Sequence, residues 1–261
     1  MPLLEVNGTA LHYHVKGNGT PLVCIHPPLL TSEVFNYQMS ELSDEFRLVA
    51  FDIRGHGLSA PSRQPITYPL IVEDMIRLTE LLGLDKCWLC GYFTGASVAL
   101  EALLTAPAKF AGAIVISGMP EMNDWYNRTR VRLALAAARA GGKGLLSAAV
   151  SYGNADLPIT YRNLKRAADL GDIANILQYF ECSLSYSSTR LLGHIRQPVL
   201  LVFGQKDRPF MRYARLLKQR LPNAELHLLP GAGHQLPTKA KDQLHPVIRQ
   251  WLRSSADHPG M

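Results

Sequence analysis

The sequence predicts a single α/β domain built on a mostly parallel, eight-stranded sheet with helices on both faces. Short apolar runs rich in β-branched residues alternate with longer helical patterns, which is typical of parallel strands joined by crossover helices. The chain has 261 residues, of which 47% are hydrophobic and 18% are charged. This length and composition are sufficient to bury one sizeable core.

Eight short apolar segments are expected to form the strands. They span residues 3–6, 11–16, 22–25, 48–51, 87–90, 113–116, 199–203 and 226–229. The first two flank Asn7-Gly8, a pair that favours a tight hairpin turn, so they are expected to pair antiparallel at one edge of the sheet. Helical patterns separate most of the later segments, which are therefore expected to run parallel.

Five segments with helical periodicity accompany the strands, at residues 32–42, 70–82, 94–104, 210–221 and 240–252. Residues 119–193 are rich in Ala, Leu, Tyr and Arg and contain no strand pattern. We expect this stretch to form a helical cap that is inserted after the sixth strand and lies over the strand ends. Residues 1–118 and 194–261 are expected to form the core domain, and the cap is not expected to fold independently.

The charge and the amino-terminal segment bear on partners and location. The formal net charge is +6, but the Lys and Arg residues are scattered, so nucleic acid is not an expected partner. No stretch approaches the roughly 18 apolar residues that span a bilayer, and the first residues do not have the pattern of a signal peptide. We therefore expect a cytoplasmic protein with no membrane partner.

The cysteines are too few and too dispersed for a disulfide framework. Cys87 and Cys90 match the pattern C-x-x-C, but they lie in a predicted strand, where residues three apart point to opposite faces. These two cysteines are therefore expected to be buried thiols. The sequence shows no metal-ligand spacing and no phosphate-binding glycine loop, so we expect no metal and no cofactor.

Polar or glycine-containing segments follow five of the predicted strands. Ligands of open α/β sheets bind at the carboxyl ends of the strands, so these segments predict a site for a small-molecule ligand or substrate. In chain order, the segments are His26-Pro27-Pro28, D-x-R-G-x-G-x-S at residues 52–59, Gly91-Tyr92-Phe93-Thr94-Gly95, Gly204-Gln205-Lys206-Asp207 and Pro230-Gly231-Ala232-Gly233-His234.

With these five segments the chain resembles the α/β-hydrolase-fold superfamily, from the first strand to the last helix. In that family the turn G-x-S-x-G carries the nucleophile, and an acid and a histidine follow later in the chain. The resemblance implies that Phe93 stands at the nucleophile position, that Asp207 is the acid and that His234 is the general base. It further implies hydrolysis of an ester- or amide-type bond in a small carbonyl substrate.

Two residues depart from the family pattern. The side chain of Phe93 has no nucleophilic atom, so no acyl-enzyme can form there. The resemblance assigns the two donors of the oxyanion hole to Thr94 and Pro28, but proline has no backbone N–H, and Leu29 is the alternative donor. Ser97 lies one helical turn beyond the motif and is expected to point into the packing.

The predicted substrate-binding residues are His26, Tyr92, Trp125 and Tyr126. Aromatic residues of the cap have two interpretations, because they could form a pocket wall or hold the cap to the core. The candidates are Trp125, Tyr126, Tyr152, Tyr161, Tyr179 and Phe180.

Three functions stay open. The first is a pseudoenzyme, a small-molecule binder or an inactivated variant of a hydrolase. The second is a lyase, isomerase or epimerase in which Asp207 and His234 transfer a proton. The third is a protein-interaction module that uses the Arg-rich cap. The sequence leaves the oligomeric state undetermined.

Overall fold

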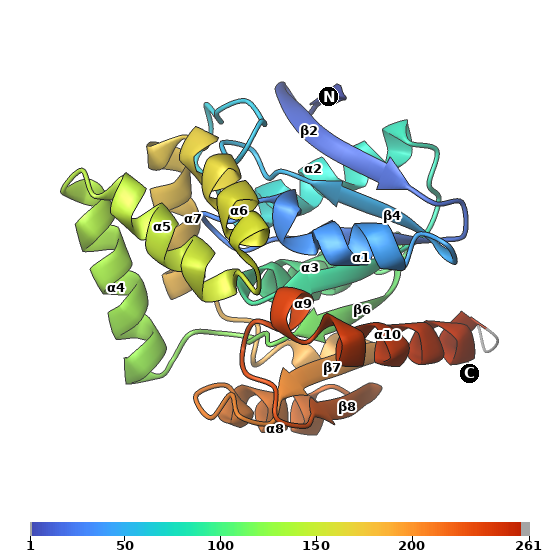
Figure 1. The fold of residues 1–261 in the computed structure, drawn as a ribbon. Coiled ribbons are helices and arrows are strands. Elements are labelled where there is room, and N and C mark those ends of the chain that lie inside the picture. Colours follow the sequence, from blue (N-terminus) through green and yellow to red (C-terminus); the bar gives the residue numbers. More distant parts are fainter. Residues whose placement is uncertain (1, 257–261) are drawn as a thin grey trace.

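The computed structural model describes residues 2–256 and contains an eight-stranded sheet in the order β1-β2-β4-β3-β5-β6-β7-β8 (Figure 1). β1 and β2 pair antiparallel, as do β2 and β4, and the remaining neighbours are parallel. The predicted fold class and the hairpin at Asn7-Gly8 are confirmed. The strands are β1 (Leu3–Val6), β2 (Thr9–Lys16), β3 (Thr20–Ile25), β4 (Phe46–Phe51), β5 (Cys87–Tyr92), β6 (Phe110–Ile116), β7 (Val199–Gly204) and β8 (Ala224–Leu229).

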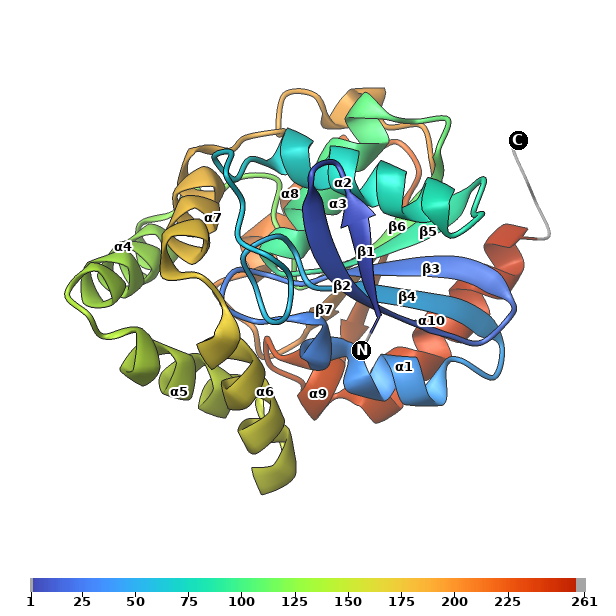
Figure 2. The same cartoon turned by 90° about the horizontal axis from the view of Figure 1, so that it is seen from above.

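Helices cover both faces of the sheet (Figure 2). One face packs against α2 (Tyr68–Leu81), α3 (Thr94–Thr105) and α8 (Met211–Arg220), with η2 (Leu192–His194) at its border. The other face packs against η1 (Ser32–Phe35), α1 (Asn36–Glu41), α9 (Leu236–Lys239) and α10 (Lys241–Ala256). Successive side chains of a strand point to opposite faces, so Cys87 joins the first core cluster and Cys90 the second. Both thiols are buried, as expected.

Four helices between β6 and β7 form the cap. They are α4 (Trp125–Arg139), α5 (Lys143–Asn154), α6 (Pro158–Leu170) and α7 (Ile173–Ser185), and Figures 1 and 2 show them together at one end of the sheet. Helix α7 is tied to the core, because the Tyr179 hydroxyl donates to the carbonyl of His26 at 3.1 Å and Asn175 accepts from the N–H of Ser62 at 2.8 Å. The cap therefore rests on the carboxyl ends of the strands through α7.

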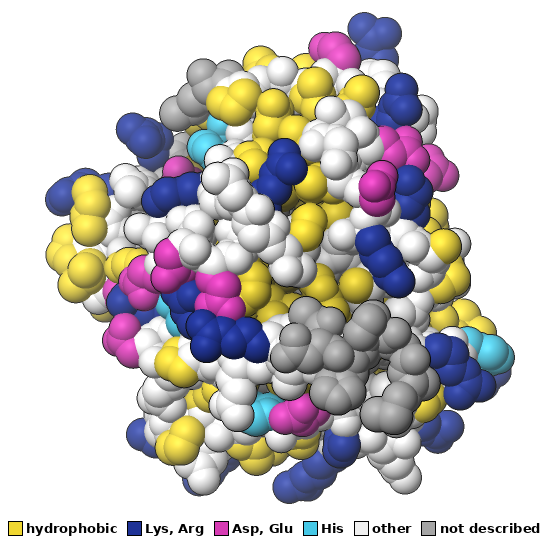
Figure 3. Space-filling model, turned by 90° about the vertical axis from the view of Figure 1, so that its right-hand side faces the viewer, with side chains coloured by type: hydrophobic (Ala, Val, Ile, Leu, Met, Phe, Trp, Pro, Cys, Tyr) yellow, Lys and Arg dark blue, Asp and Glu magenta, His cyan; other side chains and the backbone are white. Residues whose placement is uncertain are grey.

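The surface mixes charges of both signs. On the face shown in Figure 3, Lys and Arg side chains are interspersed with Asp and Glu. Arg249 and Arg253 of α10, for example, both pair with Glu45, at 2.8 and 2.6 Å. Among the helices that the structure describes, none is both long enough and apolar enough to cross a membrane.

Asp52 is a buried carboxylate that joins three segments below the strand ends. Its Oδ1 accepts hydrogen bonds from the N–H and the hydroxyl of Ser32, at 2.9 and 2.7 Å. Its Oδ2 accepts from the N–H of Leu58 at 3.0 Å and lies 2.9 Å from Nδ1 of His12. Burial acts to raise the pKa of Asp52, but these hydrogen bonds and the neighbouring His26 outweigh it and lower the pKa to about 2.

The rest of the D-x-R-G-x-G-x-S segment also has a structural role. Arg54 pairs with buried Asp74, with Nε 2.6 Å from Oδ2. Gly57 has a φ of 53°, and a Cβ there would lie 2.2 Å from Oδ2 of Asp52. Ser59 donates to the Asp52 carbonyl at 2.5 Å. The segment therefore holds a tight loop together beneath the cap.

Replacing Asp52 by Asn is expected to destabilise the fold by about 3 kcal/mol. The amide nitrogen of Asn cannot accept a hydrogen bond, so it would face backbone N–H groups that now donate to the carboxylate. The control is Asp242→Asn, whose carboxylate is 86% exposed and pairs with Lys241, and it should cost less than about 0.5 kcal/mol. Urea unfolding measures both changes. An Asp52→Asn variant as stable as the control would contradict the structural role of Asp52.

The stabilisation from Asp52 should also depend on pH. Its pKa of about 2 in the folded protein lies below the pKa of about 3.9 in an unfolded chain. The stabilisation is therefore fully present at pH values above the unfolded pKa, and it is lost as the pH falls toward the folded pKa of about 2. The difference in unfolding free energy between the wild type and Asp52→Asn should therefore shrink by about 2 to 3 kcal/mol between pH 6 and pH 2. A difference that stays constant over this range would contradict the lowered pKa.

Candidate functional site

The turn between β5 and α3 places Phe93 at the carboxyl end of an inner strand. Phe93 has a φ of 54° and a ψ of −115°, a strained conformation for a bulky residue. Two glycines make the turn possible. A Cβ on Gly91 would lie 2.4 Å from Cα of Ala96, and a Cβ on Gly95 would lie 2.1 Å from the carbonyl oxygen of Ile25.

Asp207 follows β7 and His234 follows β8, so both side chains come from the same edge of the sheet as Phe93. Nδ1 of His234 lies 2.7 Å from Oδ2 of Asp207, and the Asp207 side chain is only 5% exposed. The hydroxyl of Ser117, directly after β6, donates to the carbonyl of His234 at 3.0 Å and holds the loop in place. Sequence reasoning missed Ser117, although its position after a predicted strand was the signal that could have found it.

Aromatic rings surround the imidazole of His234. The ring centroid of Phe93 lies 5.3 Å from that of His234 with the planes at 84°, an edge-to-face contact. The rings of Phe210 and Tyr92 lie at 4.2 and 5.6 Å. The structure therefore brings Phe93, Asp207 and His234 together, and it adds Phe210, which the sequence pattern did not single out.

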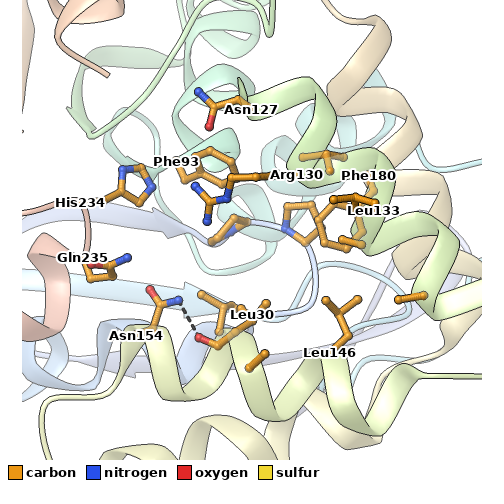
Figure 4. Close-up of a pocket in the computed structure, with 18 of the residues that line it drawn as sticks. Leu30, Phe93, Asn127, Arg130, Leu133, Leu146, Asn154, Phe180, His234 and Gln235 are labelled. Carbon is orange, nitrogen blue, oxygen red and sulfur yellow. Dashed lines mark hydrogen bonds between the residues drawn. The ribbon is translucent and has the colours of Figure 1, made fainter. Parts of the chain in front are cut away.

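A cavity of about 520 Å³ lies between this site and the cap (Figure 4). This volume is within the range of small-molecule sites, and most of the lining is apolar. The core contributes Pro27, Pro28, Leu30, Tyr92, Phe93, His234 and Gln235, and the cap contributes Asn127, Arg130, Val131, Leu133, Ala134, Ala137, Leu145, Leu146, Ala149, Val150, Gly153, Asn154 and Phe180.

Several sequence-predicted residues lie at this cavity. Tyr92 is buried in its floor, and its hydroxyl donates to Oδ1 of Asn154 at 2.9 Å, which connects the core to the cap.

Thr94 is buried at the start of α3, while Pro28 lines the cavity and has no backbone N–H. The backbone N–H groups of Thr94 and Leu29 donate to no acceptor within residues 2–256. The Ser97 hydroxyl donates to the carbonyl of Met119 at 2.6 Å, which confirms that it points into the packing.

The sequence predicts that His26 contacts substrate, but the structure does not place His26 at this cavity. His26 is fully buried and does not line the cavity. Its Nε2 accepts from the N–H of Ile53 at 2.9 Å, and its Nδ1 lies 2.9 Å from the carbonyl oxygen of Pro27. Both ring nitrogens are therefore used in holding the loops beneath the cavity, and burial lowers the pKa of this imidazole.

Trp125 and Tyr126, which the sequence also predicts to bind substrate, lie away from this cavity. Trp125 is 80% exposed at the start of α4, and Tyr126 is 46% exposed with its ring 5.3 Å from Cζ of Arg130. Neither ring lines the cavity. Helix α4 instead turns Asn127, Arg130 and Val131 toward it, because residues three or four apart share one helical face.

The polar groups of the site suit an organic ligand. Within residues 2–256, no three His, Cys, Asp or Glu side chains converge in a way that could hold a metal ion. A histidine held by a carboxylate at the end of an apolar cavity is an arrangement for proton transfer to or from a bound compound.

Comparisons with known proteins identify the family of this chain. The model of the alpha/beta hydrolase family matches residues 22–245. The chain is similar to the human serine hydrolase BPHL, with 24% identity over 96% of this chain and 85% of that protein. It is also similar to the putative carbamate hydrolase RutD of a Caulobacter species, with 26% identity over 84% of this chain and 85% of that protein.

Solved structures share the fold. The enol-lactonase of Burkholderia xenovorans has a TM-score of 0.87 at 20% identity, over 97% of this chain and 100% of that chain. An esterase of Exiguobacterium antarcticum has a TM-score of 0.87 at 17% identity, over 96% of this chain and 98% of that chain. The family model spans most of the sequence, and the eight-stranded, mostly parallel sheet with its helices agrees with it. The chain therefore belongs to the alpha/beta hydrolase family.

Proposed function

We propose that this chain binds a small carbonyl compound in the cavity beneath the cap and does not form an acyl-enzyme, because Phe93 occupies the nucleophile position. The observation that carries the proposal is the place of Phe93, at a strained turn with its ring 5.3 Å from the imidazole of His234. In a serine hydrolase the residue at this turn attacks the carbonyl carbon after histidine removes its proton. A phenyl ring provides neither the attacking oxygen nor the proton.

The remaining groups are suited to holding a carbonyl compound. The backbone N–H groups of Thr94 and Leu29 are free to donate to a carbonyl oxygen, whereas Pro28 provides no donor. The apolar walls favour the hydrocarbon part of a ligand. The similar serine hydrolase, and the enol-lactonase and esterase that share the fold, support the class of carbonyl compounds. The four cysteines are free thiols, which supports a place in the reducing cytoplasm.

Proton transfer without hydrolysis is the second candidate function, as in a lyase, isomerase or epimerase. The retained pair favours it, because Asp207 holds Nδ1 of His234 at 2.7 Å and leaves Nε2 for a ligand. A base at this place could remove a proton from the carbon next to a bound carbonyl group. Positioned bases of this kind contribute about 10² to 10⁴ to a rate, and they require no nucleophile at position 93.

The nucleophile position is tested by restoring a hydroxyl. Wild type should not react with a fluorophosphonate, whereas Phe93→Ser should be labelled at position 93 and should hydrolyse p-nitrophenyl acetate at least about a hundred-fold faster than wild type. Phe93→Ala is the matched control, because it removes the same ring without adding a hydroxyl. Mass spectrometry of the labelled peptide identifies the site.

Two outcomes would contradict this assignment. Labelling of the wild type at Ser97 or Thr94 would show that another nucleophile is present. A folded Phe93→Ser variant that stays unreactive, even when Pro28→Gly restores a backbone N–H, would show that position 93 is not the nucleophile position.

The second candidate predicts hydrogen exchange at a carbon next to a carbonyl group. In D₂O, the wild type should accelerate deuterium incorporation into the methyl group of acetophenone, and His234→Ala should reduce that acceleration about a hundred-fold. Asp207→Asn should also reduce it, because Asp207 orients the imidazole. Proton NMR follows the exchange, and His227→Ala is the control because His227 pairs with Glu225 outside the site. Exchange that is indifferent to His234→Ala would eliminate this candidate.

A further inference from the structure

Arg130 of α4 brings a permanent positive charge to a cavity that is otherwise mostly apolar. Of the residues found to line the cavity within the described chain, Arg130 is the only Lys or Arg, and none is Asp or Glu. Figure 4 shows its side chain reaching from the cap toward Phe93 and His234. Its charge also acts on Tyr92 in the floor, where burial raises the pKa of the phenol, the charge of Asp207 raises it further and Arg130 opposes both.

Some cations of the cap have partners in the protein, whereas Arg132, Arg162 and Arg166 have none within residues 2–256 and do not line the cavity. Arg128 donates to the carbonyls of Met122 and Leu184 at 2.9 and 3.1 Å, and Lys165 pairs with Asp169 at 2.5 Å. The guanidinium of Arg130 has no carboxylate or carbonyl partner within residues 2–256, and its contact there is the ring of Tyr126, 5.3 Å from Cζ. Its hydrogen-bond donors are therefore available to a ligand.

Two other polar side chains of the cavity, by contrast, already form hydrogen bonds within the protein. The amide of Asn154 accepts from Tyr92 at 2.9 Å and donates to the carbonyl of Val150 at 2.9 Å. The amide of Asn127 donates to Asp124 at 3.1 Å. These two amides therefore mainly stabilise the protein through their hydrogen bonds. The side-chain amide of Gln235, which also lines the cavity, has no hydrogen-bond partner within residues 2–256. The side-chain groups available to a ligand are therefore the guanidinium of Arg130 on the cap side, and Nε2 of His234 and the amide of Gln235 on the core side.

The charge and shape of a guanidinium indicate what it binds. Arginine is always protonated, and its planar fork matches the two oxygens of a carboxylate. Arg130 is exposed to solvent, so this attraction is partly screened, and the apolar wall beside it strengthens the attraction only in part. A single guanidinium balances the one negative charge of a carboxylate better than the nearly two charges of a phosphate monoester.

We propose that the ligand carries a carboxylate and that Arg130 binds it, with the carbonyl part of the ligand facing His234. This inference rests on the proposed function, since it names the chemical class of the ligand in the same cavity. The ligand is then a small organic acid that also contains a carbonyl group, and its hydrocarbon part lies among side chains such as Val131, Leu146 and Phe180.

The test compares two probes of nearly equal shape, 4-phenylbutyrate and 4-phenylbutanamide, by isothermal titration calorimetry. The wild type should bind the acid about ten-fold more tightly than the neutral amide, because only the acid forms a charged pair with Arg130. Arg130→Gln should lower the affinity for the acid to the level of the affinity for the amide, and it should leave the affinity for the amide unchanged. Arg130→Lys should bind the acid with intermediate affinity, since it keeps the charge without the fork.

Two controls separate the cavity from its charge. Arg132→Gln changes an exposed arginine of the same helix that does not line the cavity, and it should alter neither affinity. Ala134→Phe fills the cavity and should abolish binding of both probes, with thermal melting as the check that the variant folds. The acid, and not the amide, should lose affinity when salt is raised from 50 to 500 mM.

The outcomes separate this inference from the proposed function. Equal affinities for the two probes, or a preference for the acid that survives Arg130→Gln, would overturn the role of Arg130. If Ala134→Phe still abolished binding in those cases, the cavity would remain the ligand site. If the wild type bound neither probe, the carboxylate class would be overturned. The nucleophile assignment would then still depend on the separate labelling of Phe93→Ser.

Discussion

The site depends on one steric constraint, the turn that leads from β5 into α3. The backbone at Gly95 lies so close to the carbonyl oxygen of Ile25 that no Cβ fits between them. The positive φ of Phe93 turns its side chain away from the sheet and toward the cavity. Parallel strands end at the same edge, so the loops after β7 and β8 bring Asp207 and His234 to this turn.

The ring contacts of Phe93 compensate for the backbone strain at this residue. A bulky residue in this backbone region costs on the order of 1 to 3 kcal/mol. The ring of Phe93 contacts the rings of His234 and Phe210, at 5.3 and 5.7 Å, and aromatic pairs contribute about 0.5 to 1.5 kcal/mol each beyond the area they bury. The contacts therefore offset much of the strain. A phenylalanine at this turn is stabilised by the histidine that a serine would otherwise use.

The cap supplies most of the residues that line the cavity. Helix α7 anchors it to the core through Tyr179 and Asn175, while α4 and α5 supply most of the walls. The core side of the cavity therefore carries Phe93 and His234, and the cap side carries Arg130, the only Lys or Arg of the lining within residues 2–256. This division matches the general rule that a fold supplies a scaffold and that specificity resides in the segments added to it.

The sequence by itself determined the fold, the edge of the sheet that carries the site, and the two departures at Phe93 and Pro28. The fold and this edge of the sheet depend on local periodicity and turn chemistry, which neighbouring residues decide. Phe93 and Pro28 are departures only in relation to the family that the chain resembles. Only the tertiary structure decided the rotation of α4, which places Arg130 at the cavity and Trp125 away from it, and the burial of His26. These features depend on contacts such as that between Tyr179 and His26, which lie 153 residues apart, and short-range sequence patterns do not encode such packing.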